Sequence, residues 1–171
     1  KKALSDFSKA IELDDTNYLF FKFRGELYSD GFKYKKALKD FSKAIELNNK
    51  DDSLFSERGK QKYYEKDYEG AISDSSKALD LNPKNYLAYY YRGIAKKELK
   101  KEYKEYEEII EDLDRAYELS DNPSVLMPIV DLKEEQKDYQ GALKKLNFII
   151  KMDPYFRDFK RIASLKFKIK D

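Results

Sequence analysis

Apolar and small residues recur along the chain with the spacing of an amphipathic helix, at intervals of four and then three residues. The segments 2–14 and 36–48 are almost identical in sequence and begin 34 residues apart. Polar residues such as Asp14, Asn48 and Asn82 end these segments, so each segment predicts a helix with one buried face. The successive members of this buried stripe are Ala3, Phe7, Ala10; Ala37, Phe41, Ala44; Ala71, Ser75, Ala78; Ile109, Leu113, Ala116; and Ala142, Leu146, Ile149.

A second kind of helix is predicted before each stripe. In three units an aromatic residue is followed by Arg and Gly, as in Phe21, Arg24, Gly25; Phe55, Arg58, Gly59; and Tyr89, Arg92, Gly93. Glycine costs about 1 kcal/mol relative to Ala inside a helix, so its regular return indicates that two helices approach closely there. We expect Ala37 and Ala71 to supply the surface opposite the glycines. The turns between paired helices should be filled by Tyr34, Tyr68, Tyr106 and Tyr139.

A period of 34 residues is typical of stacked helix-turn-helix repeats, which bury their apolar faces on one another. The chain is therefore predicted to be one all-α array of antiparallel helix pairs. Repeat four is longer, because Gly93 and Ile109 are 16 residues apart where Gly59 and Ala71 are 12 apart, and this adds about one helical turn near 100–104. The units predicted within 1–171 are the second helix of a truncated repeat one (1–15), repeat two (18–50), repeat three (52–83), repeat four with its insertion (86–121), a divergent repeat five (124–153) and a closing helix (155–170).

The repeated positions resemble the pattern of the tetratricopeptide repeat (TPR) family. That pattern places an aromatic residue, a Gly four residues later, a small residue twelve after the Gly, and then an aromatic residue, an Ala and a Pro. Repeat five departs from it, since Val130, close to Pro128, stands where the Gly is expected. The resemblance implies a right-handed superhelix whose concave groove binds an extended peptide or a partner helix. The matching residues are Phe21, Gly25, Tyr28, Ala37, Phe41 and Ala44 in repeat two, and Phe55, Gly59, Ala71, Ala78 and Pro83 in repeat three.

The repeated arginines could form either an anion site or a set of structural ion pairs. Repeat five has lost the Arg and a matching Asp together, and carries Ile129 and Lys145 in their places. This coupled loss favours structural pairing through bidentate hydrogen bonds, although Asp6 leaves open a pairing with the preceding repeat. The expected pairs are Arg24 with Asp40, Arg58 with Asp74, and Arg92 with Asp112.

One line of side chains on each first helix lies beside the packed stripe and should face the groove. Its chemistry changes along the array, from polar in repeat two to aromatic and apolar in repeat four. We expect these side chains to be exposed and to anchor a ligand near Tyr63, Tyr90, Ile94 and Lys97. Tyr90 could instead pack against a neighbouring helix, as aromatic residues commonly do. The groove residues predicted from these lines are Lys22, Glu26, Ser56, Lys60, Tyr63, Tyr90, Ile94 and Lys97.

Chaperone-binding members of the TPR family grip a C-terminal carboxylate with Lys and Asn at set groove positions. The matching positions of this chain carry Lys22 with Glu26, then Glu57, then Leu87 with Tyr91. Because Glu26 and Glu57 would repel a carboxylate, this activity is not predicted.

The composition of the chain mainly excludes classes of function. The 35 basic and 33 acidic residues leave a formal net charge of +2, so no basic excess favours nucleic acid as a partner. The chain has no His, no Cys and no Gly-rich phosphate loop, so no catalytic role, metal site or cofactor is predicted. No apolar run approaches the roughly 18 residues of a membrane span. A hydrophobic content of 41% is enough for a continuous core.

Two functions remain open, a protein or peptide-binding adaptor and a structural spacer or oligomerisation arm of a longer protein. The chain starts within a second helix and without an initiator Met. We interpret it as a fragment whose upstream targeting signal is not seen, and we favour a cytoplasmic location. Apolar faces at both ends predict self-association through the open helices; they comprise Leu4, Phe7 and Ile11 at one end and Tyr155, Phe156, Phe159, Ile162, Ala163 and Phe167 at the other.

Overall fold

The computed structural model describes residues 2–99, 105–153 and 155–170. Within these residues the chain forms ten α-helices, one short 3-10 helix and no strand. The extra helical turn predicted near 100–104 lies outside the described residues. In chain order the elements are α1 (Lys2–Leu13), α2 (Tyr18–Asp30), α3 (Tyr34–Leu47), α4 (Asp52–Tyr64), α5 (Tyr68–Leu81), α6 (Tyr86–Leu99), α7 (Glu105–Ser120), η1 (Pro123–Leu126), α8 (Met127–Glu135), α9 (Tyr139–Met152) and α10 (Phe159–Lys170).

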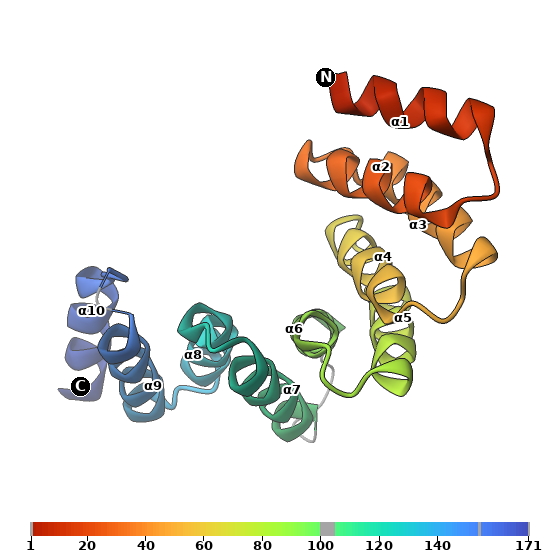
Figure 1. The fold of residues 1–171 in the computed structure, drawn as a ribbon. Coiled ribbons are helices and arrows are strands. Elements are labelled where there is room, and N and C mark those ends of the chain that lie inside the picture. Colours follow the sequence, from red (N-terminus) through yellow and green to blue (C-terminus); the bar gives the residue numbers. More distant parts are fainter. Residues whose placement is uncertain (1, 100–104, 154, 171) are drawn as a thin grey trace.

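The helices pair in antiparallel fashion and stack into a curved array (Figure 1). The pairs are α2 with α3, α4 with α5, α6 with α7, and α8 with α9, while α1 packs on α2 and α10 packs on α9. The first helices α2, α4, α6 and α8 follow the concave side of the curve, and the second helices α3, α5, α7 and α9 follow the convex side (Figure 1). The prediction of an all-α array of helix pairs is confirmed for the described residues.

The three repeated glycines lie where paired helices cross most closely. A Cβ atom added at any of them would lie 3.1 Å from a side chain of the facing second helix, so the predicted close packing is confirmed. The predicted partners Ala37 and Ala71 are not the nearest side chains. The closest atoms at Gly25 belong to Phe41, and Ala71 approaches Gly59 with its backbone oxygen, 3.3 Å from the Cβ position. The side chains opposite belong to the next position of the stripe, in the pairs Gly25 with Phe41, Gly59 with Ser75, and Gly93 with Leu113.

The tight turns between paired helices contain residues in the left-handed conformation. Phe32, Lys66 and Lys137 have φ angles of 55°, 64° and 61°. This region costs an L-residue roughly 1–2 kcal/mol. In repeat two the left-handed residue is Phe32 and not the neighbouring Gly31, which would adopt this conformation without strain. Gly31 instead ends the helix with a negative φ of −86°.

Each Arg that precedes a repeated glycine forms a bidentate ion pair with an Asp of the following second helix. The prediction of structural pairs is confirmed, and the partner of Arg24 lies in its own repeat rather than at Asp6. Arg24 and Arg58 also donate to Ser8 and Ser42 in the second helix of the preceding repeat, at 3.2 and 3.4 Å. The shortest N–O distances are 2.7 Å for Arg24–Asp40, 2.7 Å for Arg58–Asp74 and 2.6 Å for Arg92–Asp112.

Repeat five keeps the paired plan with a modified first helix. Asn122 caps the short helix η1 by accepting the Ser124 amide at 3.0 Å. Pro123 stands at the start of η1 and Pro128 at the start of α8, where a missing N–H costs little. Val130, at the glycine position, is fully buried.

The closing helix is shorter than predicted. It begins at Phe159 rather than at Tyr155, because the Asp158 side chain accepts the Arg161 amide at 3.1 Å and caps the first turn. Leu165 is buried in the core of repeat five, whereas Phe159 and Phe167 are exposed.

Candidate functional site

A cavity of about 380 Å³ lies between the first helices α4, α6 and α8, on the concave side of the array. Four of the residues predicted from the sequence, those expected to anchor a ligand, line it together. The full lining is Tyr63, Tyr64, Tyr90, Tyr91, Ile94, Lys97, Glu98, Pro128 and Asp131.

The predicted exposure is wrong for two groove residues. Ile94 is only 6% exposed and forms part of the apolar core next to the cavity. Ser56 is 2% exposed and donates to the Ser53 carbonyl at 3.1 Å. The Asn85 side chain donates to the Ser56 hydroxyl, also at 3.1 Å, so Ser56 joins α4 to the start of α6 instead of facing a ligand.

The aromatic lining of the cavity is a connected set of tyrosines. Tyr64 stacks on Tyr34 with ring centroids 4.7 Å apart, and its hydroxyl hydrogen-bonds the Tyr91 hydroxyl at 3.1 Å. Tyr91 in turn lies 5.7 Å from Tyr63 and meets Tyr90 edge-on at 5.2 Å. Tyr90 is half-buried, so it packs against its neighbours and also reaches the cavity. The contacts hold the aromatic walls in fixed positions before any ligand arrives.

Burial raises the pKa of three phenols of this set, those of Tyr63, Tyr90 and Tyr91. It raises the pKa of Tyr63 to about 12, with a smaller contribution from the nearby Glu98 carboxylate. The hydroxyls of these three tyrosines therefore stay neutral well above neutral pH and can both donate and accept hydrogen bonds.

Charged side chains form the rim of the cavity, and the one lysine among the described lining residues, Lys97, is already paired with carboxylates. The Lys97 ammonium lies 3.7 Å from Asp131 and 3.6 Å from Glu135. Glu98 is exposed and makes no ion pair within the part of the chain that the structure describes. Among the described residues, the charge at this rim that lacks an ion pair is therefore negative.

The remaining predicted groove residues lie nearer the N-terminus, on α2 and α4. Lys22 is paired with Asp51 at 3.1 Å, and Lys60 is paired with Glu57 at 3.3 Å. Burial raises the pKa of Glu26 and the Glu57 carboxylate adds to the effect, while the nearby Lys22 and Lys60 ammonium groups oppose it. Lys60 lines a second cavity of about 260 Å³, which shares Tyr64 with the first.

Sequence reasoning missed Tyr64 and Asp131 in the cavity lining. Tyr64 follows Tyr63 directly and lies outside the line of groove positions. Its place in the lining depends on stacking against Tyr34, which the spacing of residues does not reveal. Asp131 could have been found by extending the repeat alignment, because Val130 stands at the glycine position and Asp131 then corresponds to Ile94.

The described residues contain no cluster of possible metal ligands. Among the helices of the described part of the chain, none has the length and apolar content required to cross a bilayer. The features that the concave side offers are an aromatic cavity, paired lysines and unpaired carboxylates.

Stacked antiparallel helix pairs with glycines at their crossings and a concave row of first helices define the tetratricopeptide repeat fold, an α-solenoid. No protein-family model matches the sequence, and no curated protein sequence matches it.

Solved structures do match the fold. The chain is similar to MamA 41-end from Desulfovibrio magneticus RS-1, with a TM-score of 0.78, 16% identity, and 92% of this chain and 87% of that chain covered. It is similar to YrrB, described as a TPR protein with an unusual peptide-binding site, with a TM-score of 0.72, 21% identity, and 96% and 84% coverage. It is also similar to the first TPR of Spaghetti (RPAP3) bound to the HSP90 peptide SRMEEVD, with a TM-score of 0.63, 25% identity, and 73% and 96% coverage.

Proposed function

We propose that this protein is a non-catalytic scaffold that binds a peptide or a partner helix in its concave groove. The observation that carries the proposal is the cavity between α4, α6 and α8, where four tyrosines and Ile94 surround about 380 Å³. Its volume lies within the range of about 300–1,000 Å³ typical of ligand sites. A large apolar side chain of the ligand fits this surrounding, and aromatic anchors of this kind contribute most of the energy in many interfaces.

The charges of the groove indicate the residues that flank this anchor. Lys22, Lys60 and Lys97 are each held in an ion pair, whereas Glu26 and Glu98 make no ion pair within the described residues. A ligand with basic residues beside its apolar anchor would compensate these carboxylates. A peptide that ends in a free carboxylate would meet Glu26 and Glu57 instead, so we do not expect the chain to bind a peptide through its C-terminal carboxylate.

Two of the structurally similar proteins support a peptide as the ligand class. The YrrB structure is described as having a peptide-binding site, and the RPAP3 domain was solved with a peptide. The shared fold carries the analogy, and the cavity of this chain supplies its own chemistry.

Selection from a displayed random peptide library tests the proposal. We expect enriched sequences to combine one aromatic or large aliphatic residue with nearby Lys or Arg, and to perturb the amide signals of Tyr63, Tyr90 and Lys97 on titration. Binding by acidic peptides alone, or perturbation confined to the convex side, would contradict it.

A spacer or oligomerisation role is the second candidate, supported by the open faces of α1 and α10. No side chain of α1 is fully buried, and Phe7 contacts only one aromatic ring among the described residues, that of Phe23 at 5.7 Å. Sedimentation over a hundredfold range of concentration should then show association. It should weaken when Phe7 and Ile11 are replaced by Ser, and a strict monomer at every concentration would exclude oligomerisation through these faces.

A further inference from the structure

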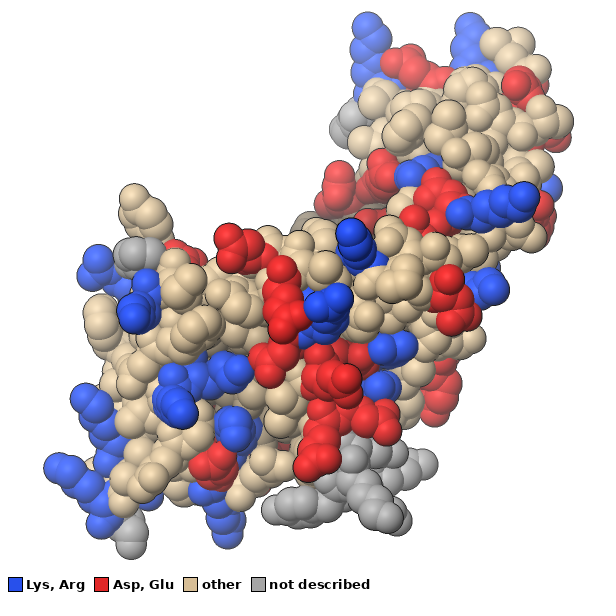
Figure 2. Space-filling model, turned by 60° about the horizontal axis from the view of Figure 1, so that its bottom comes forward, with Lys and Arg blue, Asp and Glu red and all other residues tan. Residues whose placement is uncertain are grey.

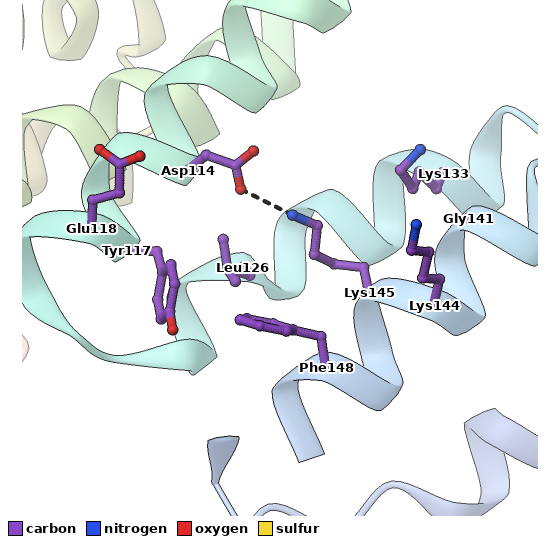
Figure 3. Close-up of a pocket in the computed structure, with 9 residues that line it drawn as sticks. All are labelled: Asp114, Tyr117, Glu118, Leu126, Lys133, Gly141, Lys144, Lys145 and Phe148. Atoms are coloured by element: carbon purple, nitrogen blue, oxygen red, sulfur yellow. Dashed lines mark hydrogen bonds and ion pairs between the residues drawn. The ribbon is translucent and has the colours of Figure 1, made fainter. Parts of the chain in front are cut away.

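A cavity larger than the one in the groove lies on the convex side of repeat five. It measures about 660 Å³ and opens between the second helices α7 and α9, with η1 and α8 beneath it. Figure 3 shows its walls, with Asp114 and Tyr117 on one side and Lys145 and Phe148 on the other. The complete lining is Asp114, Tyr117, Glu118, Leu126, Lys133, Gly141, Lys144, Lys145 and Phe148.

Alignment of the repeats shows that this cavity replaces a polar furrow. In repeat four the same place holds the ion pair of Arg92 and Asp112, in a furrow that is polar along its length. In repeat five every charged position except one has changed its chemistry. The correspondence, from repeat four to repeat five, is Tyr89 to Leu126, Arg92 to Ile129, Lys96 to Lys133, Glu108 to Gly141, Glu111 to Lys144, Asp112 to Lys145 and Arg115 to Phe148.

These replacements open the furrow and make its floor apolar. Ile129 is fully buried and cannot bridge the helices as Arg92 does, and Lys145 turns away to pair with Asp114 at 3.0 Å. Leu126, which is 1% exposed, provides the floor where the larger Tyr89 stands in repeat four. Phe148 meets Tyr117 edge-on at 5.7 Å and remains 38% exposed. The exposed ring borders a cavity of about 660 Å³, whereas the equivalent furrow of repeat four measures about 490 Å³ and keeps its ion pair.

The charge left over at the rim is positive. Both carboxylates of the lining are paired, Asp114 with Lys145 and Glu118 with Arg115 at 2.7 Å. Lys144 is exposed and makes no ion pair within the described residues. Figure 2 shows the same asymmetry on the lower face, with basic side chains gathered at the C-terminal end and acidic ones over the middle. Helices α9 and α10 contain no acidic residue, and their basic residues are Lys144, Lys145, Lys151, Lys160, Arg161, Lys166, Lys168 and Lys170.

We propose that this convex cavity is a second docking site, which binds an acidic peptide segment. The segment inserts one large apolar side chain over Leu126 and against Phe148, and it places a carboxylate beside Lys144. Charge complementarity selects an acidic partner here, whereas the concave groove selects a basic one. The two sites therefore take different ligands, and one chain can hold two partners on opposite faces.

The probe is an acetylated, amidated pentapeptide with one Phe and one Leu among three Asp residues, and the control peptide carries Lys in place of Asp. Nuclear magnetic resonance titration of the full chain should show the acidic probe perturbing the amides of Gly141, Lys144 and Phe148. The control peptide should bind at least tenfold more weakly. Equal binding of both peptides, no binding at millimolar concentration, or perturbation centred on Tyr63 and Tyr90 would overturn the proposal.

Repeat four supplies the matched variants. Lys144→Glu copies Glu111 on an exposed position and should weaken the acidic probe about tenfold, whereas Lys151→Glu makes the same charge change farther along α9 and should have less than a twofold effect. Ile129→Arg with Lys145→Asp rebuilds the ion pair of repeat four, and should narrow the cavity, make it polar and abolish binding. If that double variant does not fold, Lys144→Glu still decides, and equal affinities of Lys144→Glu and Lys151→Glu would refute the site.

Discussion

Replacing Arg24 with Met should destabilise its repeat more than the same change at Arg58. The Asp40 carboxylate is 3% exposed and accepts two hydrogen bonds from Arg24, at 2.7 and 2.8 Å. No other cation within the described residues forms an ion pair with Asp40. Asp74, the partner of Arg58, by contrast also forms an ion pair with Lys62 at 2.9 Å, which remains when Arg58 is replaced.

The magnitude follows from the charge that is left unpaired. Removing one partner of a buried ion pair typically costs about 3–5 kcal/mol. We expect Arg24→Met to fall at the lower end, about 3 kcal/mol, because the Arg24 side chain is partly exposed and water can approach Asp40. Arg58→Met should cost about 1–2 kcal/mol, since the remaining lysine compensates most of the charge.

The assay must be local, because stacked repeats unfold as coupled neighbouring units rather than as one block. Hydrogen exchange followed by mass spectrometry gives the opening free energy of peptides from α2 and α3 in one variant, and of peptides from α4 and α5 in the other. Arg24→Met with Asp40→Leu should recover most of the loss, since no buried charge then remains. Equal losses for the two single variants, or no recovery in the double variant, would refute the reasoning.

Three further perturbations test other parts of the structure. Gly59→Leu should cost about 1–3 kcal/mol in urea unfolding through overpacking, because even a Cβ would lie 3.1 Å from Ser75, and an unchanged midpoint would contradict close packing. Lys66→Gly should raise the melting temperature by relieving a φ of 64°, whereas Lys50→Gly, in a turn without positive φ, should lower it. Because folding raises the pKa of Tyr63 from 10.0 to about 12, its neutral form contributes stability below pH 10 that is lost as the pH rises through 12; urea titrations at pH 9 and 11 should show a smaller loss in Tyr63→Phe than in wild type.

The fold could be predicted because its causes repeat. The returning glycines, the helical spacing of the stripe and the joint loss of Arg and Asp at Ile129 and Lys145 each report a contact within one repeat. Contacts of this kind depend on residues a fixed distance apart, so comparison of the copies inside one chain reveals them. Comparison of the copies did not predict which side chain lies opposite each glycine. Side-chain direction decides this, and at Gly25 the nearest atoms belong to Phe41 and not to Ala37.

The site could be predicted only in part. The line of groove positions led to Tyr63, Tyr90, Ile94 and Lys97, and the structure brings all four to one cavity. It could not show that Ser56 is buried, because that depends on Asn85 reaching across from the next repeat. The convex cavity could not be predicted from the sequence pattern either. The loss of an ion pair does not show whether neighbouring side chains fill the space that the pair leaves.

Calorimetry on Tyr90→Ala, with a peptide selected on the wild-type chain, tests the central claim most directly. Loss of one aromatic anchor should cost about 2 kcal/mol of binding free energy and weaken affinity roughly thirtyfold. The Tyr90 ring also packs on Tyr91, so the variant loses some stability and must be titrated well below its melting temperature. Tyr86→Ala, on the same helix but outside the cavity lining, is the control and should bind like wild type. An affinity of Tyr90→Ala equal to that of Tyr86→Ala would contradict the proposed groove.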